Sequence, residues 1–191
     1  MNTGPGEHED AVLAARAQAG DDHAFAALMG RHKEWLYRFI RRYVGDGEEA
    51  YDLLQETFVA AWSALSAYDP ARPISAWLRR IALNKCRDWN RRRLVRGFFY
   101  FAESLDRRAE QGVSLEAPND AGEAAERDMQ RLDRAVAALP ASLKEPLLLT
   151  VFEGLSQREA SEALGISPKA VETRIRRAKA ALTRLMGASG P

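Results

Sequence analysis

The chain has 191 residues, of which 46% are hydrophobic, so it can build one medium-sized or two small folded domains and is not a disordered protein. Its formal net charge of +1 hides a segregation of charge along the sequence. Cys86 is the only cysteine, which excludes an intramolecular disulfide and a thiolate-rich zinc site, and His8, His23 and His32 show no ligand spacing with it. We therefore expect no metal and no other cofactor.

Two basic runs enclose an acidic spacer. Eight Lys or Arg residues stand against the single Asp88 between positions 79 and 96, and six stand against the single Glu172 between positions 169 and 186. Residues 97–128 hold eight acidic and three basic residues, which cancels this excess in the total. Such a pattern suggests a polyanion that is held at two points.

The first half of the chain has helical spacing, and the alternation typical of strands is absent, so we predict an all-α protein. A short helix runs from about Glu9 to Gly20, and Asp21 or Asp22 caps a long second helix. One face of that helix is apolar and should be buried. Its residues are Phe25, Leu28, His32, Leu36, Phe39, Ile40 and Tyr43.

The sequence 45–47, Gly-Asp-Gly, separates this helix from a third, which we expect from Glu48 to about Leu65. Its inward residues are Leu54, Phe58, Ala61, Trp62 and Leu65. A loop at 68–73 contains two prolines, which fix the backbone locally. A fourth helix starts at Ile74, with Trp77, Leu78, Ile81 and Trp89 at core spacing.

The stretch 97–126 is acidic and rich in turn-forming residues, so we interpret it as a flexible linker between a domain at 1–96 and a domain at 127–191. After it, Met129 to Leu139 has the spacing of a fifth helix, and a sixth is expected at 143–152. Pro146 fits there only if that helix starts within one turn before it, where the missing N–H is unpaired anyway.

Residues 155–185 predict two short helices joined by a tight turn. A helix that begins near Ser156 turns Ala160 and Leu164 inward, Gly165 supplies a left-handed turn, and Ser167-Pro168 starts the next helix. That helix has an apolar stripe made of Val171, Ile175, Ala178, Leu182 and Leu185. The opposite face presents Lys169, Thr173, Arg176 and Arg177, flanked by Glu172, Lys179 and Arg184. This pattern is typical of a DNA-reading helix-turn-helix; the alternative is an ordinary amphipathic helix with a solvated basic face.

Three motifs in order resemble one family. They read DLLQETFVAAW at 52–62, ISAWLRRIALNKCRDWNRRR at 74–93, and LPASLKEPLLLTVFEGLSQREASEALGISPKAVETRIRRAKAAL at 139–182. Together they resemble the extracytoplasmic-function (ECF) sigma factors, group 4 of the sigma-70 family of bacterial transcription initiation factors. The resemblance implies a sigma2-like helical bundle at 1–96 and a sigma4-like helix-turn-helix domain at 127–191. It also implies a protein that directs core RNA polymerase to promoters and has no enzymatic activity of its own.

The same resemblance implies three sets of contact residues. Those that meet the clamp helices of the polymerase β′ subunit are Asp52, Leu53, Gln55, Glu56 and Phe58. Those that bind and open the promoter −10 region are Tyr68, Asp69, Ile74, Trp77, Arg80, Asn84, Lys85, Arg87, Arg91, Arg92 and Arg93. Those that read the −35 element are Lys169, Glu172, Thr173, Arg174, Arg176, Arg177 and Lys179. The flap of the polymerase β subunit is a further expected partner.

Some of these positions have a plainer interpretation. Trp77 and Trp89 also have ordinary core spacing, and the polar row at 52–56 is also compatible with a solvated helix face. The four aromatic residues at 98–101 either close the core of the first domain or form an apolar patch that contacts the second domain or a regulator.

Regulation and location follow from the resemblance and from composition. Family members are commonly held by an anti-sigma factor, often membrane-bound, so we expect such a partner. The N-terminus has acidic residues instead of a basic stretch followed by an apolar run, and no apolar span has membrane length. We expect a cytoplasmic protein that an anti-sigma factor holds at the inner membrane.

Two other functions compete with this interpretation. A conventional regulator would use the helix-turn-helix alone and bind a palindromic site as a dimer, without recruiting core polymerase. An enzyme is disfavoured because the sequence has no phosphate loop, metal cluster or nucleophile-and-base arrangement.

Overall fold

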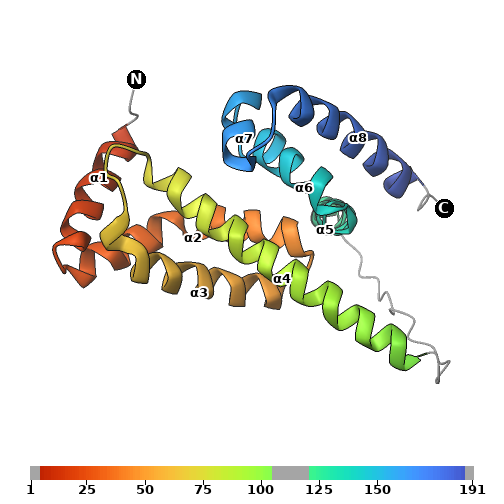
Figure 1. Cartoon of the computed structure of the whole chain (residues 1–191), viewed down its shortest axis with the longest axis horizontal. Helices are drawn as coiled ribbons and strands as arrows, with labels where there is room; N and C mark the ends of the chain where they lie inside the picture. The colour runs from red at the N-terminus through yellow and green to blue at the C-terminus, as the bar shows by residue number, and fades with distance from the viewer. Residues whose placement is uncertain (1–4, 105–120, 188–191) are drawn as a thin grey trace.

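The structure is a computed structural model that describes residues 5–104 and 121–187, with side chains described for residues 8–94 and 129–187. Its first part contains α1 (Pro5–Gln18), α2 (Asp22–Val44), α3 (Gly47–Ala64), the short 3-10 turn η1 (Leu65–Ala67) and α4 (Ile74–Ser104). Its second part contains α5 (Ala121–Ala138), α6 (Ala141–Leu147), the π-helical segment η2 (Leu148–Phe152), α7 (Gln157–Leu164) and α8 (Pro168–Gly187). All regular elements of the described residues are helical, which confirms the predicted all-α fold with two helical domains (Figure 1).

Helix α2 is the central element of the first domain, because α1, α3 and α4 all pack against it. Asp21 is its N-cap and accepts a hydrogen bond from the Ala24 backbone at 3.1 Å. Gly45 ends the helix in the left-handed conformation, with φ of +84°. The predicted inward residues of this helix are all buried, which confirms its orientation. They are Phe25, Leu28, His32, Leu36, Phe39, Ile40 and Tyr43.

Helix α3 follows the predicted orientation with one exception. Leu54, Ala61 and Leu65 are buried and Phe58 is partly buried against the core. Trp62 was expected to point inward but is 43% exposed; its ring contacts that of Phe25, with 4.8 Å between the centroids.

Helix α4 ends at Ser104 and α5 begins at Ala121, and both ends fall within the stretch 97–126 that was predicted as the linker between the domains. The side chains at 98–101 lie outside the described residues, so both roles proposed for these aromatics stay predictions.

The second domain also departs from expectation at Pro146. Helix α6 begins at Ala141, more than one turn before the proline, so the helix interior lacks one backbone donor at this point. The chain then widens into η2, where Glu153 N donates to Leu148 O at 3.0 Å. The Thr150 hydroxyl donates to the Pro146 carbonyl at 2.8 Å and satisfies it.

The helix-turn-helix forms as predicted, because its local signals agree. Ser156 and Glu159 make a reciprocal capping box at the start of α7. Gly165 ends α7 with φ of +67°, and the Ser167 hydroxyl accepts from Ala170 N at 3.2 Å as α8 begins. Val171 and Ala178 are fully buried, whereas Leu185, at the end of the predicted stripe, is 43% exposed.

The two domains lie side by side, with the second domain resting on α2 and α4 (Figure 1). Helix α5 and η2 contact α2, and ion pairs join α4 to residues of α6 and to the residue after η2. None of the helices in the described residues is both long enough and apolar enough to span a membrane.

Candidate polymerase and nucleic-acid interfaces

The first candidate surface is the outer face of α3. Asp52 and Gln55 are exposed there, and no hydrogen bond or ion pair within the described residues engages the Asp52 carboxylate. Glu56 is half-buried, and its Oε2 lies 3.2 Å from Lys85 Nζ and 3.8 Å from Arg92 Nη2. Leu53, by contrast, is only 2% exposed. It belongs to the core and supports the surface from beneath, as does the partly buried Phe58.

Large apolar side chains also stand on this face, and the sequence interpretation missed them. Tyr51 is 48% exposed, Val59 66% and Trp62 43%. Together with Gln55 they recur every three or four residues, the spacing that places side chains on one side of a helix. That spacing was a usable signal, since an exposed apolar row beside carboxylates is typical of a partner-binding surface.

The second candidate surface begins at the loop between η1 and α4. Contacts of the buried Tyr68 with its neighbours hold this loop in place. The Tyr68 ring lies 5.1 Å from that of Trp77, and the Tyr68 hydroxyl donates to the Arg72 carbonyl. Gln18 of α1 donates from Nε2 to the Tyr68 carbonyl at 2.9 Å. Burial raises the pKa of the Tyr68 hydroxyl, which stays protonated and able to donate. Asp69 is exposed, and its Oδ1 accepts from Ala71 N at 3.0 Å.

Two residues assigned to −10 contacts are buried in this arrangement. Tyr68 is 5% exposed and Ile74 4%, so both fix the loop and the start of α4 instead of facing solvent. Trp89 is also a core residue, 6% exposed, and its indole N–H donates to Glu49 Oε2 at 2.7 Å. Core packing is therefore the role of Trp89, as its spacing suggested. Trp77 is half-buried and reaches the surface beside the loop.

The basic face of α4 carries the remaining predicted residues. Arg80, Asn84, Arg91, Arg92 and Arg93 are exposed, and Lys85 is half-buried beside Glu56. Arg91 forms an ion pair of 2.6 Å with Asp88 of its own helix, and the Arg93 guanidinium lies 5.3 Å from the centre of the Trp89 ring. Arg87 differs from all of these, because Glu145 of the second domain binds it.

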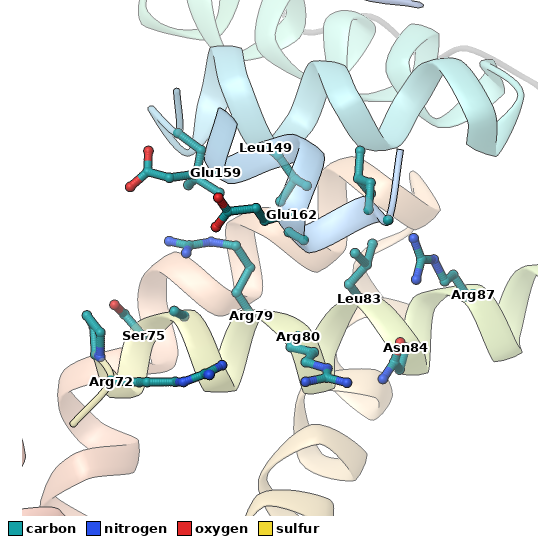
Figure 2. Close-up of a pocket in the computed structure, with 16 residues that line it drawn as sticks. Arg72, Ser75, Arg79, Arg80, Leu83, Asn84, Arg87, Leu149, Glu159 and Glu162 are labelled. Carbon is teal, nitrogen blue, oxygen red and sulfur yellow. The ribbon is translucent and has the colours of Figure 1, made fainter. Parts of the chain in front are cut away.

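A cleft of about 740 Å³ lies between the N-terminal part of α4, as far as Arg87, and α7 (Figure 2). Arg79, Arg80 and Arg87 line it on the α4 side, and Glu159 and Glu162 line it on the α7 side. Arg79 was not among the predicted contact residues. Its position, four and eight residues before Leu83 and Arg87, places it on the face of α4 that meets the second domain.

The third candidate surface is the outer face of α8. Arg176, Arg177 and Lys179 are exposed, and no hydrogen bond or ion pair within the described residues engages their side chains. Lys169 and Glu172 are exposed as well and pair at 2.8 Å, which lowers the pKa of the Glu172 carboxyl. The two other predicted residues are half-buried. They are Thr173, whose hydroxyl donates to the Lys169 carbonyl at 2.9 Å, and Arg174.

Each of the two helical modules presents a basic helix face with exposed arginines, on α4 in the first and on α8 in the second, and such faces suit contact with nucleic acid. Comparison with known families is specific. Residues 28–94 match the model of sigma-70 region 2, and residues 129–182 match that of sigma-70 region 4. The two matches fall on the first and the second helical domain.

Individual relatives agree over nearly the whole chain. The RNA polymerase sigma factor CnrH of Cupriavidus metallidurans is 42% identical over 95% of this chain and 96% of its own length. The ECF RNA polymerase sigma factor SigM of Mycobacterium tuberculosis is 31% identical over 95% of this chain and 88% of its own. The solved structure of CnrH in complex with the cytosolic domain of CnrY superposes with a TM-score of 0.68, at 37% identity, covering 95% of this chain and 99% of that one.

The chain therefore belongs to the ECF sigma factors of the sigma-70 family. It is an RNA polymerase sigma factor, and family membership implies core RNA polymerase and promoter DNA as its partners. A sigma factor is not an enzyme; it supplies promoter recognition to the polymerase that carries out the chemistry.

Proposed function

We propose that the three surfaces divide the work of promoter recognition among them. The outer face of α3, with Asp52 and Gln55 beside exposed apolar side chains, binds the β′ clamp helices of core polymerase. The loop before α4 and the basic face of that helix bind and open the −10 region, and α8 reads the −35 element. The β flap binds the second domain. The observation that carries the proposal is the pair of basic faces, one in each domain, at the two regions that match the sigma-70 family.

The physical fit of each surface supports these assignments. Carboxylates and apolar side chains together suit a helical partner that offers basic and apolar groups. Exposed arginines on α4 suit the phosphates of a strand whose bases are unstacked, and those on α8 suit a duplex groove. Because each contact is modest, joining two of them in one chain raises the affinity for DNA through effective concentration.

We also propose that an anti-sigma factor, anchored in the membrane, regulates this protein. Support comes from CnrH, which was solved with the cytosolic domain of CnrY. The name "cytosolic domain" suggests that CnrY has a further part outside the cytosol. A sigma factor held in this way would reside in the cytoplasm, at the inner membrane, until it is released.

The role of α3 is testable by reversing one charge in the full chain. Asp52→Lys should weaken binding to core polymerase by at least about tenfold, because it opposes a basic partner and breaks no internal contact. Fluorescence anisotropy of the labelled factor, titrated with core enzyme, measures this affinity. Glu34→Lys, the same reversal on the exposed face of α2, is the matched control and should bind core polymerase as the native chain does.

Arg176→Ala tests the DNA contact of α8 separately from polymerase binding. It should leave the affinity for core polymerase intact and weaken binding of the resulting holoenzyme to promoter DNA. A conventional dimeric regulator predicts otherwise: neither the native chain nor Asp52→Lys would bind core polymerase, and DNA binding would not depend on it. Equal loss of both affinities in Arg176→Ala would indicate an unfolded domain, which circular dichroism detects.

A further inference from the structure

Glu145 of α6 lies in the second domain, but the side chains that bind it belong to the first domain. Arg87 of α4 contacts both of its carboxylate oxygens, from Nε to Oε1 at 3.0 Å and from Nη2 to Oε2 at 2.6 Å. The Tyr43 hydroxyl of α2 donates to the same Oε1 at 3.2 Å, and Glu145 is only 8% exposed. A guanidinium fork binds carboxylate and phosphate with the same geometry, so Glu145 occupies Arg87 in the way that a DNA phosphate would.

Lys144 makes a second bridge beside it. Its Nζ donates to the Tyr43 carbonyl at 2.8 Å and to the Ala137 carbonyl at 2.6 Å, and lies 4.6 Å from the centre of the Tyr43 ring. The Tyr43 carbonyl is in the last turn of α2, where carbonyls lack helical partners and a cation is favoured. Lys144 thus ties the end of α2 in the first domain to the end of α5 in the second.

A further contact lies where η2 ends. Glu153 Oε2 is 3.4 Å from both Nε and Nη2 of Arg79, whose guanidinium also lies 5.2 Å from the centre of the Trp35 ring. Next to it, the Arg42 guanidinium lies 4.6 Å from the centre of the Phe152 ring. Arg79 and Arg87 are two turns apart on α4, so acidic groups of the second domain occupy this face at two places.

The backbones of the domains also meet closely. A methyl group added at Gly45 would lie 2.6 Å from the Cβ of Ala137, closer than two non-bonded carbon atoms can approach. Glycine at the end of α2 therefore permits the approach of α5. An ion pair of 3.4 Å between Arg42 Nε and Asp133 Oδ1, too poorly aligned for a hydrogen bond, lies in the same region.

Because many of these contacts are polar, the two domains can part at a lower cost in free energy than two apolar surfaces would require. Charges that are paired inside an interface regain water when it opens, so separation costs less than exposing an equal apolar area. Water alone, however, competes poorly with a fork of hydrogen bonds at 2.6 and 3.0 Å. A polyanion and a polymerase surface compete better.

We propose that these contacts form an intramolecular lock, in which the second domain closes over α4 and Glu145 occupies Arg87 in place of DNA. This rests on the proposed function, because it takes the basic face of α4 as the −10 contact. Closure and DNA binding exclude each other at Arg87, and at Arg79 the same holds through Glu153. The free factor is held closed by its own side chains, and binding to core polymerase opens it.

The lock is tested in the full chain by Glu145→Gln, which keeps the shape of the side chain and removes its charge. Two quantities are measured: the radius of gyration by small-angle X-ray scattering, and the affinity for a fluorescein-labelled single-stranded oligonucleotide of mixed sequence. The variant should be more extended than the native chain and should bind the oligonucleotide about tenfold more tightly, because one charged hydrogen-bonded pair no longer opposes opening. Glu162→Gln is the matched control. Glu162 lines the same cleft but pairs with Arg158 of its own domain at 3.3 Å, so both quantities should stay native.

A second variant opens the interface by a different mechanism. Ala137→Leu places a larger side chain against Gly45 without altering any charge, and it should extend the free chain and tighten oligonucleotide binding in the same direction. It also serves if Glu145→Gln fails to fold, which circular dichroism shows. Native dimensions and native oligonucleotide affinity in the folded variants would overturn the lock.

Transcription separates this outcome from a failure of the proposed function. With saturating core polymerase, both variants should support run-off transcription at the native level, because Glu145 and Ala137 have no role once the domains are apart. Native transcription together with unchanged dimensions contradicts the lock alone. If the native chain itself gives no transcript with core polymerase, the proposed function fails, whatever the shape of the free chain.

Discussion

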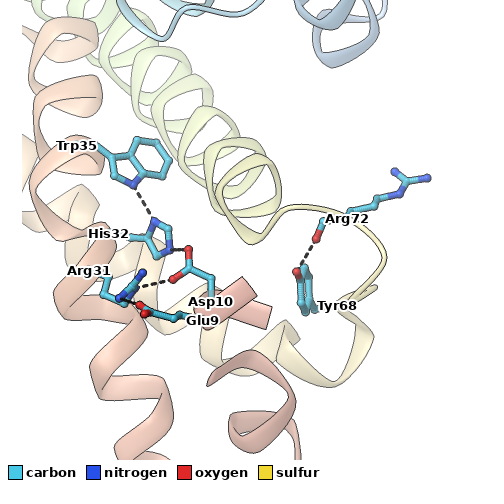
Figure 3. A network of polar contacts seen from close by, with 7 residues as sticks. All are labelled: Glu9, Asp10, Arg31, His32, Trp35, Tyr68 and Arg72. Atoms are coloured by element: carbon cyan, nitrogen blue, oxygen red, sulfur yellow. Dashed lines mark hydrogen bonds and ion pairs between the residues drawn. The ribbon is translucent and has the colours of Figure 1, made fainter. Parts of the chain in front are cut away.

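At the scale of single residues, His32 shows how a buried polar group fixes one protonation state (Figure 3). The Trp35 indole N–H donates to His32 Nδ1 at 2.8 Å, and an indole nitrogen can only donate, so Nδ1 must be an acceptor. Nε2 then carries the proton and donates to Asp10 Oδ2 at 2.9 Å. Arg31 donates to the other oxygen of Asp10 and to Glu9, which fastens α1 to α2.

This histidine makes stability depend on pH. Burial lowers the pKa of His32 below its usual 6.5, although the Asp10 carboxylate opposes the shift. As the pH falls through 6.5, the unfolded chain binds a proton that the folded chain refuses, so the free energy of unfolding decreases, by at most about 1.4 kcal/mol per pH unit. His32→Gln, which keeps a donor and an acceptor but does not titrate, should lose less stability between pH 7 and the acid side of this window. Urea denaturation at several pH values measures it.

Lys33→Gln, on the exposed side of the same helix, is the control and should keep the native pH dependence. An equally steep loss of stability in His32→Gln would mean that the lowered pKa of His32 is not the source of the pH dependence. The sequence predicted that His32 is buried, because its spacing matches that of Leu28 and Leu36. It did not predict the Asp10 partner, since pairing α1 with α2 is a tertiary contact that neither helix encodes alone.

At the scale of elements, replacing either of two glycines with alanine should change the stability of the chain in opposite directions. A methyl group added at Gly30 or at Gly165 meets nothing within 4 Å, so only the backbone decides. Gly30 lies inside α2, where alanine is the better helix former, and Gly30→Ala should stabilise the chain by about 0.5–1 kcal/mol. Gly165 has φ of +67°, and Gly165→Ala should destabilise it by about 1–2 kcal/mol. Chemical denaturation of both variants measures the difference. Equal effects would mean that the turn of the helix-turn-helix does not need a left-handed residue.

Elements with clear local signals were predictable from the sequence. Asp21, Ser156 and Gly165 mark helix ends by their own chemistry, and the structure has them at those ends. What failed depended on packing. Trp62 has inward spacing on α3, but it contacts the Phe25 ring and stays 43% exposed. Pro146 indicated a helix that starts nearby; instead the helix starts earlier and continues into π geometry.

At the scale of the whole molecule, the sequence predicted two domains but not their contact. Lys144 and Glu145 look like ordinary surface charges of a short helix, and nothing local marks them as buried. The partner of Glu145 on α2, Tyr43, is 102 residues away along the chain. The candidate contact residues came from motifs shared with the family and stay predictions, whereas the acidic groups that bind Arg79 and Arg87 became visible only in the folded chain.

Run-off transcription from a genomic promoter library tests most directly whether this chain confers promoter recognition on core RNA polymerase. Purified factor with bacterial core polymerase should yield transcripts from a small set of promoters that share two sequence elements, one for each domain. The factor alone, and core polymerase alone, should yield none from these promoters. Binding of the factor to an operator without core polymerase, and no promoter-specific transcripts when core polymerase is added, would contradict the account.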